Sequence, residues 1–131
     1  MLSELQFKNI TAAAEGQSLG GIWCRLDKKF AYNYDAEDGD KDPFPPGIRT
    51  FTEKRDAFLW VLERLLKEGR IRLHKDGKWL EGNPQEIVGL FRKAFPVSEL
   101  ASGYDDFSWW FFDDDCPGEP AWRRGDTWYF A

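Results

Sequence analysis

The residues of this chain best suited to chemistry are carboxylates gathered around an aromatic run near the C-terminal end. Between Phe95 and Trp122 there are seven acidic side chains, eight aromatic ones and no basic one. The acids are Glu99, Asp105, Asp106, Asp113, Asp114, Asp115 and Glu119, and they bracket Phe107-Ser108-Trp109-Trp110-Phe111-Phe112. Carboxylates at this density could ligate a divalent cation or attract a basic partner.

A metal-dependent enzyme is one hypothesis for these carboxylates. Asp113, Asp114 and Asp115 could hold a magnesium ion, with Asp105 and Asp106 as further ligands. Adjacent strand residues point to opposite faces, however, so three consecutive aspartates converge only in a loop. The sequence also contains no P-loop, GxSxG, HExxH or dinucleotide-binding motif. We therefore predict a protein that is not an enzyme and needs no cofactor or metal.

A protein-binding surface is the hypothesis that we favour. Buried aromatic rings supply affinity in an interface, while rim charges speed the encounter of the two partners. The predicted binding residues are Asp105, Asp106, Trp110, Asp113, Asp114, Asp115, Glu119 and Trp122, the two tryptophans serving as anchors. The alternative is that both rings are core residues beside a solvated strand end, because aromatic residues favour half-buried sheets.

The charge of the chain is unevenly distributed, which bears on the choice of partner. The net charge is −5, but Arg49 to Lys93 contains eleven basic and seven acidic residues, or +4, so the rest carries −9. Nucleic-acid affinity depends on cationic contacts with phosphates, so we expect a basic protein partner and no nucleic acid. The alternative is a single-strand site on Arg70, Arg72, Lys75 and Lys78 beside Trp79, or a general protein-interaction module.

A second acidic block runs from Asp35 to Asp42 and continues through prolines to Gly47. Breakers and like charges predict an exposed loop. The block fails as an EF-hand, because placing Gly39 at the central glycine puts Tyr34 and Ala36 at ligand positions.

Histidine and cysteine are too few to suggest a metal site. His74 is the sole histidine, and Cys24 and Cys116 lie far apart without a CxxC spacing, so we expect an ordinary hairpin residue and two free thiols. The sequence shows no secretory signal and no apolar span, so we expect a cytoplasmic location without membrane attachment. Its 131 residues fit one globular domain, 1–131.

Helix starts and hairpin turns are marked clearly along the chain. Capping patterns at Ser3/Gln6, Thr50/Glu53 and Asn83/Glu86 predict three helices, and a further short helix is expected from Ser18. Strands are predicted at 70–74, 78–80, 107–112, 121–124 and 127–130, with tight turns at Asp76-Gly77 and Gly125-Asp126. Tight turns imply antiparallel pairing, so we predict an α+β fold with helices packed on one face of an antiparallel sheet.

Three segments carry a resemblance to a known family. They are the stretch from Phe58 to Ile71, then Leu80-Glu81-Gly82 followed by Leu90 to Pro96, and Trp109-Trp110-Phe111-Phe112 with Cys116-Pro117. Together they resemble a small, functionally uncharacterised family of bacterial proteins. Some members are associated with toxin and immunity loci, such as those of contact-dependent growth inhibition. The resemblance implies an immunity role, in which the protein neutralises a basic, nuclease-like cognate toxin domain by stoichiometric occlusion.

Overall fold

The computed structural model describes residues 2–26, 48 and 50–131. Its helices are α1 (Glu4–Ala14), α2 (Leu19–Arg25), α4 (Phe51–Lys67), α5 (Pro84–Ala94), α6 (Glu99–Ser102) and the 3₁₀ helix η1 (Phe107–Phe112). Its strands are β1 (Ile71–Lys75), β2 (Lys78–Trp79), β3 (Glu119–Arg124) and β4 (Thr127–Phe130). The predicted loop from Asp35 to Gly47 lies outside the described residues. Among the helices described, none combines the length and apolar character that crossing a membrane requires.

The predicted helix starts are confirmed, and each long helix begins with a reciprocal cap. Ser3 and Gln6, Thr50 and Glu53, and Asn83 and Glu86 each form a capping box at the start of α1, α4 and α5. A capping box satisfies two of the backbone N–H groups that a helix start leaves unpaired. The short helix after Ser18 is also present. It contains Gly20, whose lack of a side chain lets the helix pass close to η1. A Cβ at Gly20 would lie 3.0 Å from the carbonyl oxygen of Ser108.

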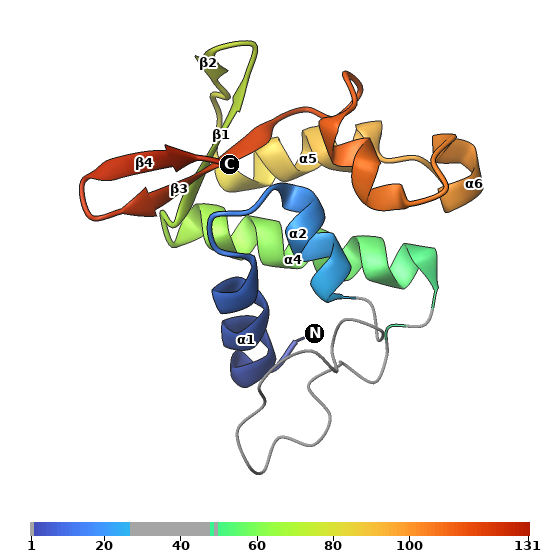
Figure 1. The fold of residues 1–131 in the computed structure, drawn as a ribbon, viewed down its shortest axis with the longest axis horizontal. Coiled ribbons are helices and arrows are strands. Elements are labelled where there is room, and N and C mark those ends of the chain that lie inside the picture. Colours follow the sequence, from blue (N-terminus) through green and yellow to red (C-terminus); the bar gives the residue numbers. More distant parts are fainter. Residues whose placement is uncertain (1, 27–47, 49) are drawn as a thin grey trace.

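The four strands form one antiparallel sheet in the order β2-β1-β3-β4. The β1–β2 and β3–β4 pairs are the two predicted hairpins, and β1 joins them by pairing Ile71 with Trp122 and Leu73 with Pro120. The strands and helices therefore confirm the α+β fold. In Figure 1 the β3–β4 hairpin reaches to the left, while α6 and η1 lie at the opposite end of the molecule.

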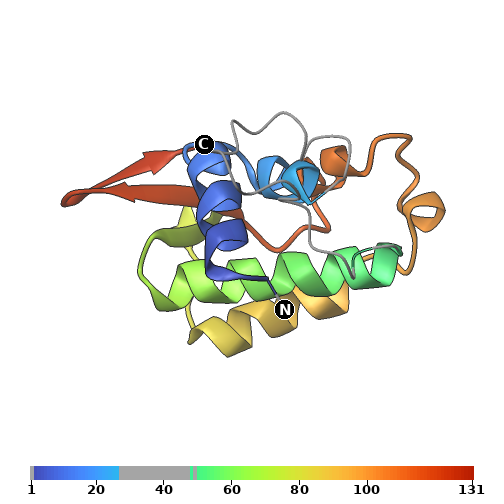
Figure 2. The same ribbon diagram turned by 90° about the horizontal axis from the view of Figure 1, so that it is seen from below.

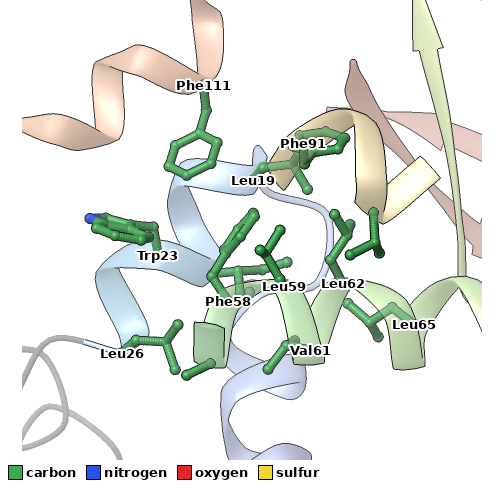
Figure 3. Packing of buried hydrophobic residues seen from close by; sticks show 14 of the residues in the cluster. Leu19, Trp23, Leu26, Phe58, Leu59, Val61, Leu62, Leu65, Phe91 and Phe111 are labelled. Carbon is green, nitrogen blue, oxygen red and sulfur yellow. The ribbon is translucent and has the colours of Figure 1, made fainter. Parts of the chain in front are cut away.

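An aromatic cluster centred on Trp23 holds the helices together. The Trp23 ring centroid lies 4.7 Å from that of Phe107 and 5.5 to 6.1 Å from those of Phe51, Phe58, Phe95 and Phe111. These rings come from α2, α4, η1 and the residue after α5, and Figure 3 shows α2 facing α4 across part of the cluster. Aromatic pairs at such distances add about 0.5–1.5 kcal/mol each to their burial.

The sheet closes the core on one side and is tied to the N-terminal helices. Ile71, Leu73 and Trp122 on its inner face are at most 3% exposed. The indole N–H of Trp122 donates to the carbonyl of Gln17 at 2.8 Å, in the turn between α1 and α2. The C-terminal hairpin is thus anchored to the first part of the chain.

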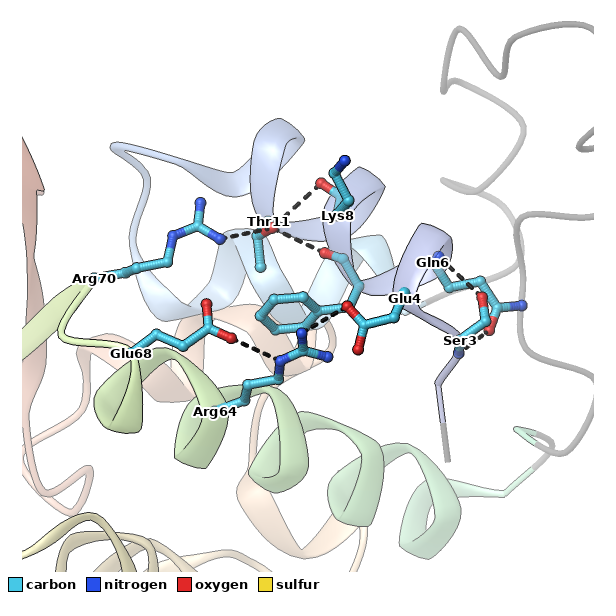
Figure 4. Close-up of polar contacts among 9 residues, drawn as sticks. Ser3, Glu4, Gln6, Lys8, Thr11, Arg64, Glu68 and Arg70 are labelled. Carbon is cyan, nitrogen blue, oxygen red and sulfur yellow. Dashed lines mark hydrogen bonds and ion pairs between the residues drawn. The ribbon is translucent and has the colours of Figure 1, made fainter.

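Contacts of the Arg64 side chain connect α1 to α4 (Figure 4). The Arg64 guanidinium donates to Glu4 of α1 at 2.7 Å and to Glu68 at 2.8 Å, and it lies 3.9 Å from the Phe7 ring centroid. The hydrogen bond from Arg64 lowers the pKa of Glu4. One side chain therefore holds α1 through both charge and aromatic contact.

The prediction of a strand over 107–112 is wrong, since this segment is the 3₁₀ helix η1. Asp106 caps it by accepting hydrogen bonds from the Ser108 N–H at 3.0 Å and the Ser108 hydroxyl at 2.8 Å. In a 3₁₀ helix, side chains three apart lie on the same face. Phe107 therefore stacks on Trp110, at 5.6 Å and 17°, toward the core, and Trp109 pairs with Phe112 at 5.8 Å on the outside.

Candidate functional site

The helix η1 presents two large aromatic side chains to solvent. Trp109 is 60% exposed and Phe112 is 54% exposed. By contrast, the predicted anchors Trp110 and Trp122 are 2% and 3% exposed. Their assignment as surface anchors is wrong, because a three-residue repeat turns Trp110 inward and the sheet pairing turns Trp122 toward the helices. Trp109 and Phe112 occupy the exposed role instead.

Aspartates lie on both sides of these two rings in the sequence. Asp105, Asp114 and Asp115 are exposed, and among the described residues their carboxylates make no hydrogen bond or ion pair. Asp106 is also exposed and caps η1. We call Asp105, Asp106, Trp109, Phe112, Asp114 and Asp115 the acidic aromatic surface.

Asp113 and Lys75 fix the segment that follows η1. Asp113 accepts a hydrogen bond from the Tyr104 hydroxyl at 2.5 Å and another from the backbone N–H of Asp115 at 3.0 Å. The Tyr104 contact, followed by the Asp115 contact, lowers the pKa of Asp113. Lys75 of β1 donates to the carbonyls of Asp114 and Cys116, at 2.9 and 2.5 Å. These contacts hold the backbone while the carboxylates of Asp114 and Asp115 remain solvated.

Glu119 does not share this arrangement. It is the first residue of β3 and the register partner of His74 in β1, so it belongs to the sheet. The structure therefore brings together the four aspartates of the acidic aromatic surface, uses Asp113 as a support, and separates Glu119.

A shallow hollow of about 200 Å³ borders the acidic aromatic surface. It lies between α2 and η1, and its lining includes Ser18, Cys24, Ser108 and Phe112. Burial raises the pKa of Cys24, so its thiol is a weak nucleophile at neutral pH. The hollow can accept a small side chain next to the Phe112 ring.

Metal ligands do not cluster in the part of the chain that the structure describes. Within residues 2–26, 48 and 50–131, no three histidine, cysteine or carboxylate side chains meet in a group able to hold a metal ion. Cys24 and Cys116 are both free thiols, and burial raises the pKa of Cys116 to about 12. The carboxylates and aromatic rings of the acidic aromatic surface can supply charge attraction and aromatic contact.

The outer face of the sheet carries a second cluster, which the sequence showed only in part. Arg72 and Trp79 were evident from the hairpin, but Arg123, Trp128 and Phe130 join them only through the pairing of β1 with β3. The Arg72 guanidinium lies 4.2 Å from the Trp79 ring centroid, and Trp79 stacks on Phe130 at 5.6 Å. A long-range strand pairing leaves no local signal in the sequence, so this cluster could not be read from spacing.

Comparisons with known proteins give likenesses in sequence and fold but no activity. The chain is similar to a solved structure from Neisseria meningitidis described as an uncharacterized protein conserved in bacteria, with a TM-score of 0.70 and 21% identity over 95% of this chain and 86% of that one. At this identity the likeness shows the fold alone. No curated protein matches the sequence. Residues 66–129, just under half of the chain, match the family described as protein of unknown function, DUF596.

Proposed function

We propose that the protein is an immunity-type inhibitor that uses the acidic aromatic surface to bind and occlude a basic toxin domain. The observation that carries the proposal is the exposure of Trp109 and Phe112 on one helix flanked by aspartates. Large apolar side chains cost little when exposed singly, but a rimmed pair is typical of a surface that becomes buried in a complex.

Further apolar surface lies at the same end of the molecule. Leu100 of α6 is 92% exposed and Val97 is 83% exposed. The short helix α6 packs beside η1, as Figure 1 shows at the right of the molecule. A partner that covers the two rings could therefore extend onto α6, while a small side chain enters the hollow beside Phe112.

The charges select the partner class. Nuclease toxins carry cationic groups along their substrate groove, since they must bind a phosphate backbone. Solvated aspartates around an aromatic pair would attract such a groove and speed the encounter, while the rings would slow dissociation. The resemblance of the chain to proteins of toxin and immunity loci points in the same direction.

The proposal predicts that a basic toxin domain is encoded beside this gene, and surface plasmon resonance against that domain tests it. The variant Asp105→Asn/Asp114→Asn/Asp115→Asn should associate at least tenfold more slowly at low salt and lose most of its salt dependence, with little change in dissociation. Trp109→Ala should accelerate dissociation and cost on the order of 2 kcal/mol of binding free energy.

A charge-matched variant separates a local effect from a change in net charge. Asp76→Asn/Glu81→Gln/Asp126→Asn removes three exposed carboxylates, two from the hairpin turns and one from the second residue after β2. It should bind like the wild type. The acidic aromatic surface is not the binding site if this control slows association as much as the Asp105/Asp114/Asp115 variant does. The same conclusion follows if the Asp105/Asp114/Asp115 variant binds normally.

A further inference from the structure

A cavity of about 470 Å³ opens at the sheet end of the molecule. Its floor includes the apolar side chains of Leu66, Leu80 and Ile87, from α4, the residue after β2 and α5. Its lining also includes Arg72, Arg123 and Trp128 of β1, β3 and β4. This volume falls within the range of small-molecule sites, which combine apolar walls with a few polar groups.

The two arginines share one face of the sheet. Arg72 pairs with Ala121 across the β1–β3 ladder, and Arg123 lies two residues further along β3, so both side chains project from the outer face. Both arginines line the cavity, so a group bound there can meet the two guanidinium ions. Neither arginine forms an ion pair with any residue that the structure describes.

Their local contacts leave hydrogen-bond donors available. The guanidinium carbon of Arg72 lies 4.2 Å from the Trp79 ring centroid and 5.9 Å from that of Trp128, and its N–H groups make no hydrogen bond with the described residues. Arg123 uses its Nε to bond the Gly125 carbonyl at 3.0 Å. Its Nη1 lies 3.7 Å from the position of a Cβ at Gly69, one of the cavity residues. Guanidinium edges of this kind are the usual donors to phosphate oxygens.

Aromatic rings line the approach to these donors. Trp128 is half-buried in the wall of the cavity, and Phe130 on the same face of β4 is 61% exposed. Nucleobases stack on aromatic side chains in complexes with single strands. Paired cations and open aromatic rings on one sheet face therefore match a phosphate with its attached base.

We propose that this cavity binds a nucleotide, with its phosphate between Arg72 and Arg123 and its base against Trp128. The exposed ring of Phe130 provides a stacking position for a second base, so we infer that the natural ligand is a short single strand. The site shares no residue with the acidic aromatic surface, and the proposal is independent of the inhibitor function. Because the whole protein carries −5, the affinity depends on these few cations and is highest at low salt.

Fluorescence anisotropy with a labelled ten-residue oligothymidylate tests the proposal, with circular dichroism confirming the fold of each variant. The wild type should bind the single strand in preference to a duplex. Arg123→Ala should weaken binding at least tenfold. Arg124→Ala is the matched control, because it removes the same charge from the adjacent residue, which faces the other side of β3 and stacks on Tyr129 at 4.6 Å. It should weaken binding less than twofold.

Two further measurements identify the ligand. With one phosphate held by both arginines, the plot of log affinity against log salt should have a slope of about −0.7, and Arg123→Ala should make this slope shallower. Calorimetric titration with thymidine monophosphate tests whether the natural ligand is a free nucleotide. Binding that is sensitive to Arg123→Ala but no tighter for the strand assigns the cavity to a free nucleotide. Equal losses in Arg123→Ala and Arg124→Ala, or no binding of either ligand, overturn the proposal.

Discussion

At the scale of single residues, the hydrogen bond between Tyr104 and Asp113 makes a pH-dependent contribution to stability. It lowers the pKa of Asp113 and raises the pKa of Tyr104. The lowered carboxyl pKa stabilises the fold above the unfolded value of about 3.9, and this stabilisation is lost as pH falls through the folded pKa. The raised phenol pKa stabilises the fold below about pH 10, and this is lost as pH rises through its folded pKa.

Tyr104→Phe should therefore lower the urea midpoint most between about pH 4 and pH 10, with a smaller loss at either extreme. Tyr129→Phe removes the same atom from a side chain that makes no hydrogen bond among the described residues, and it should leave the midpoint unchanged at every pH. A loss for Tyr104→Phe that stays constant down to pH 2 would show that the carboxylate is not the acceptor.

The thiol of Cys116 should be almost inert in the folded protein. Its pKa is raised to about 12 by burial, so only about one thiol in ten thousand is ionised at pH 8. In a Cys24→Ser variant, reaction with a disulfide reagent at pH 8 should be more than a hundredfold slower than in urea. Fast reaction in the native state would contradict the burial of this side chain, and fewer than two thiols in the denatured wild type would reveal a disulfide.

At the scale of elements, the two faces of η1 should respond differently to truncation. Trp110→Ala removes a buried ring that stacks on Phe107 and should cost about 3–5 kcal/mol of unfolding free energy. Trp109→Ala, at the next position and 60% exposed, should change stability by no more than about 0.5 kcal/mol. Urea unfolding followed by circular dichroism measures both, and similar losses would show that η1 does not have the three-residue repeat.

Most elements of the fold could be predicted from the sequence because their signals are local. A capping box lies within four residues, and a tight turn within two, so Ser3, Thr50, Asn83 and Asp76-Gly77 mark their elements directly. The run 107–112 could not be assigned in this way. Nearly every residue in it is aromatic, so the two-residue repeat of a strand and the three-residue repeat of a 3₁₀ helix fit it equally well. Only the cap at Asp106 favours a helix.

The charged residues of the candidate site could be predicted from the sequence, but its exposed aromatic residues could not. The aspartates are exposed as carboxylates normally are, whereas which tryptophan faces solvent depends on the helix type of η1. The cavity at Arg72 and Arg123 depends on the pairing of strands about fifty residues apart in the sequence. At that separation, the sequence pattern does not reveal which residues pair with each other.

At the scale of the whole molecule, Arg64 fixes the position of α1 against the rest of the fold (Figure 4). Arg64→Ala removes the ion pairs with Glu4 and Glu68 and the contact with the Phe7 ring, so α1 should be held less firmly. Hydrogen exchange should accelerate in α1 while α4 and α5 keep their protection. Arg55→Ala is a matched control, because Arg55 has the same 26% side-chain exposure and, among the described residues, pairs only with its neighbour Asp56. Equal effects of the two variants would show that the contacts of Arg64 do not hold α1 specifically.

The central position of Trp23 bears on how much of the chain is needed to make a stable molecule. The family match begins at residue 66, inside α4, and so leaves out α2, Phe51 and Phe58. A fragment of residues 66–131 would retain Phe95, Phe107 and Phe111 but lose the ring around which they gather. Expressed alone, it should expose these side chains, bind a hydrophobic dye and lack the near-ultraviolet signal of packed aromatics. We therefore expect the segment matched by the family model to need α2, and the indole of Trp23 in particular, in order to fold.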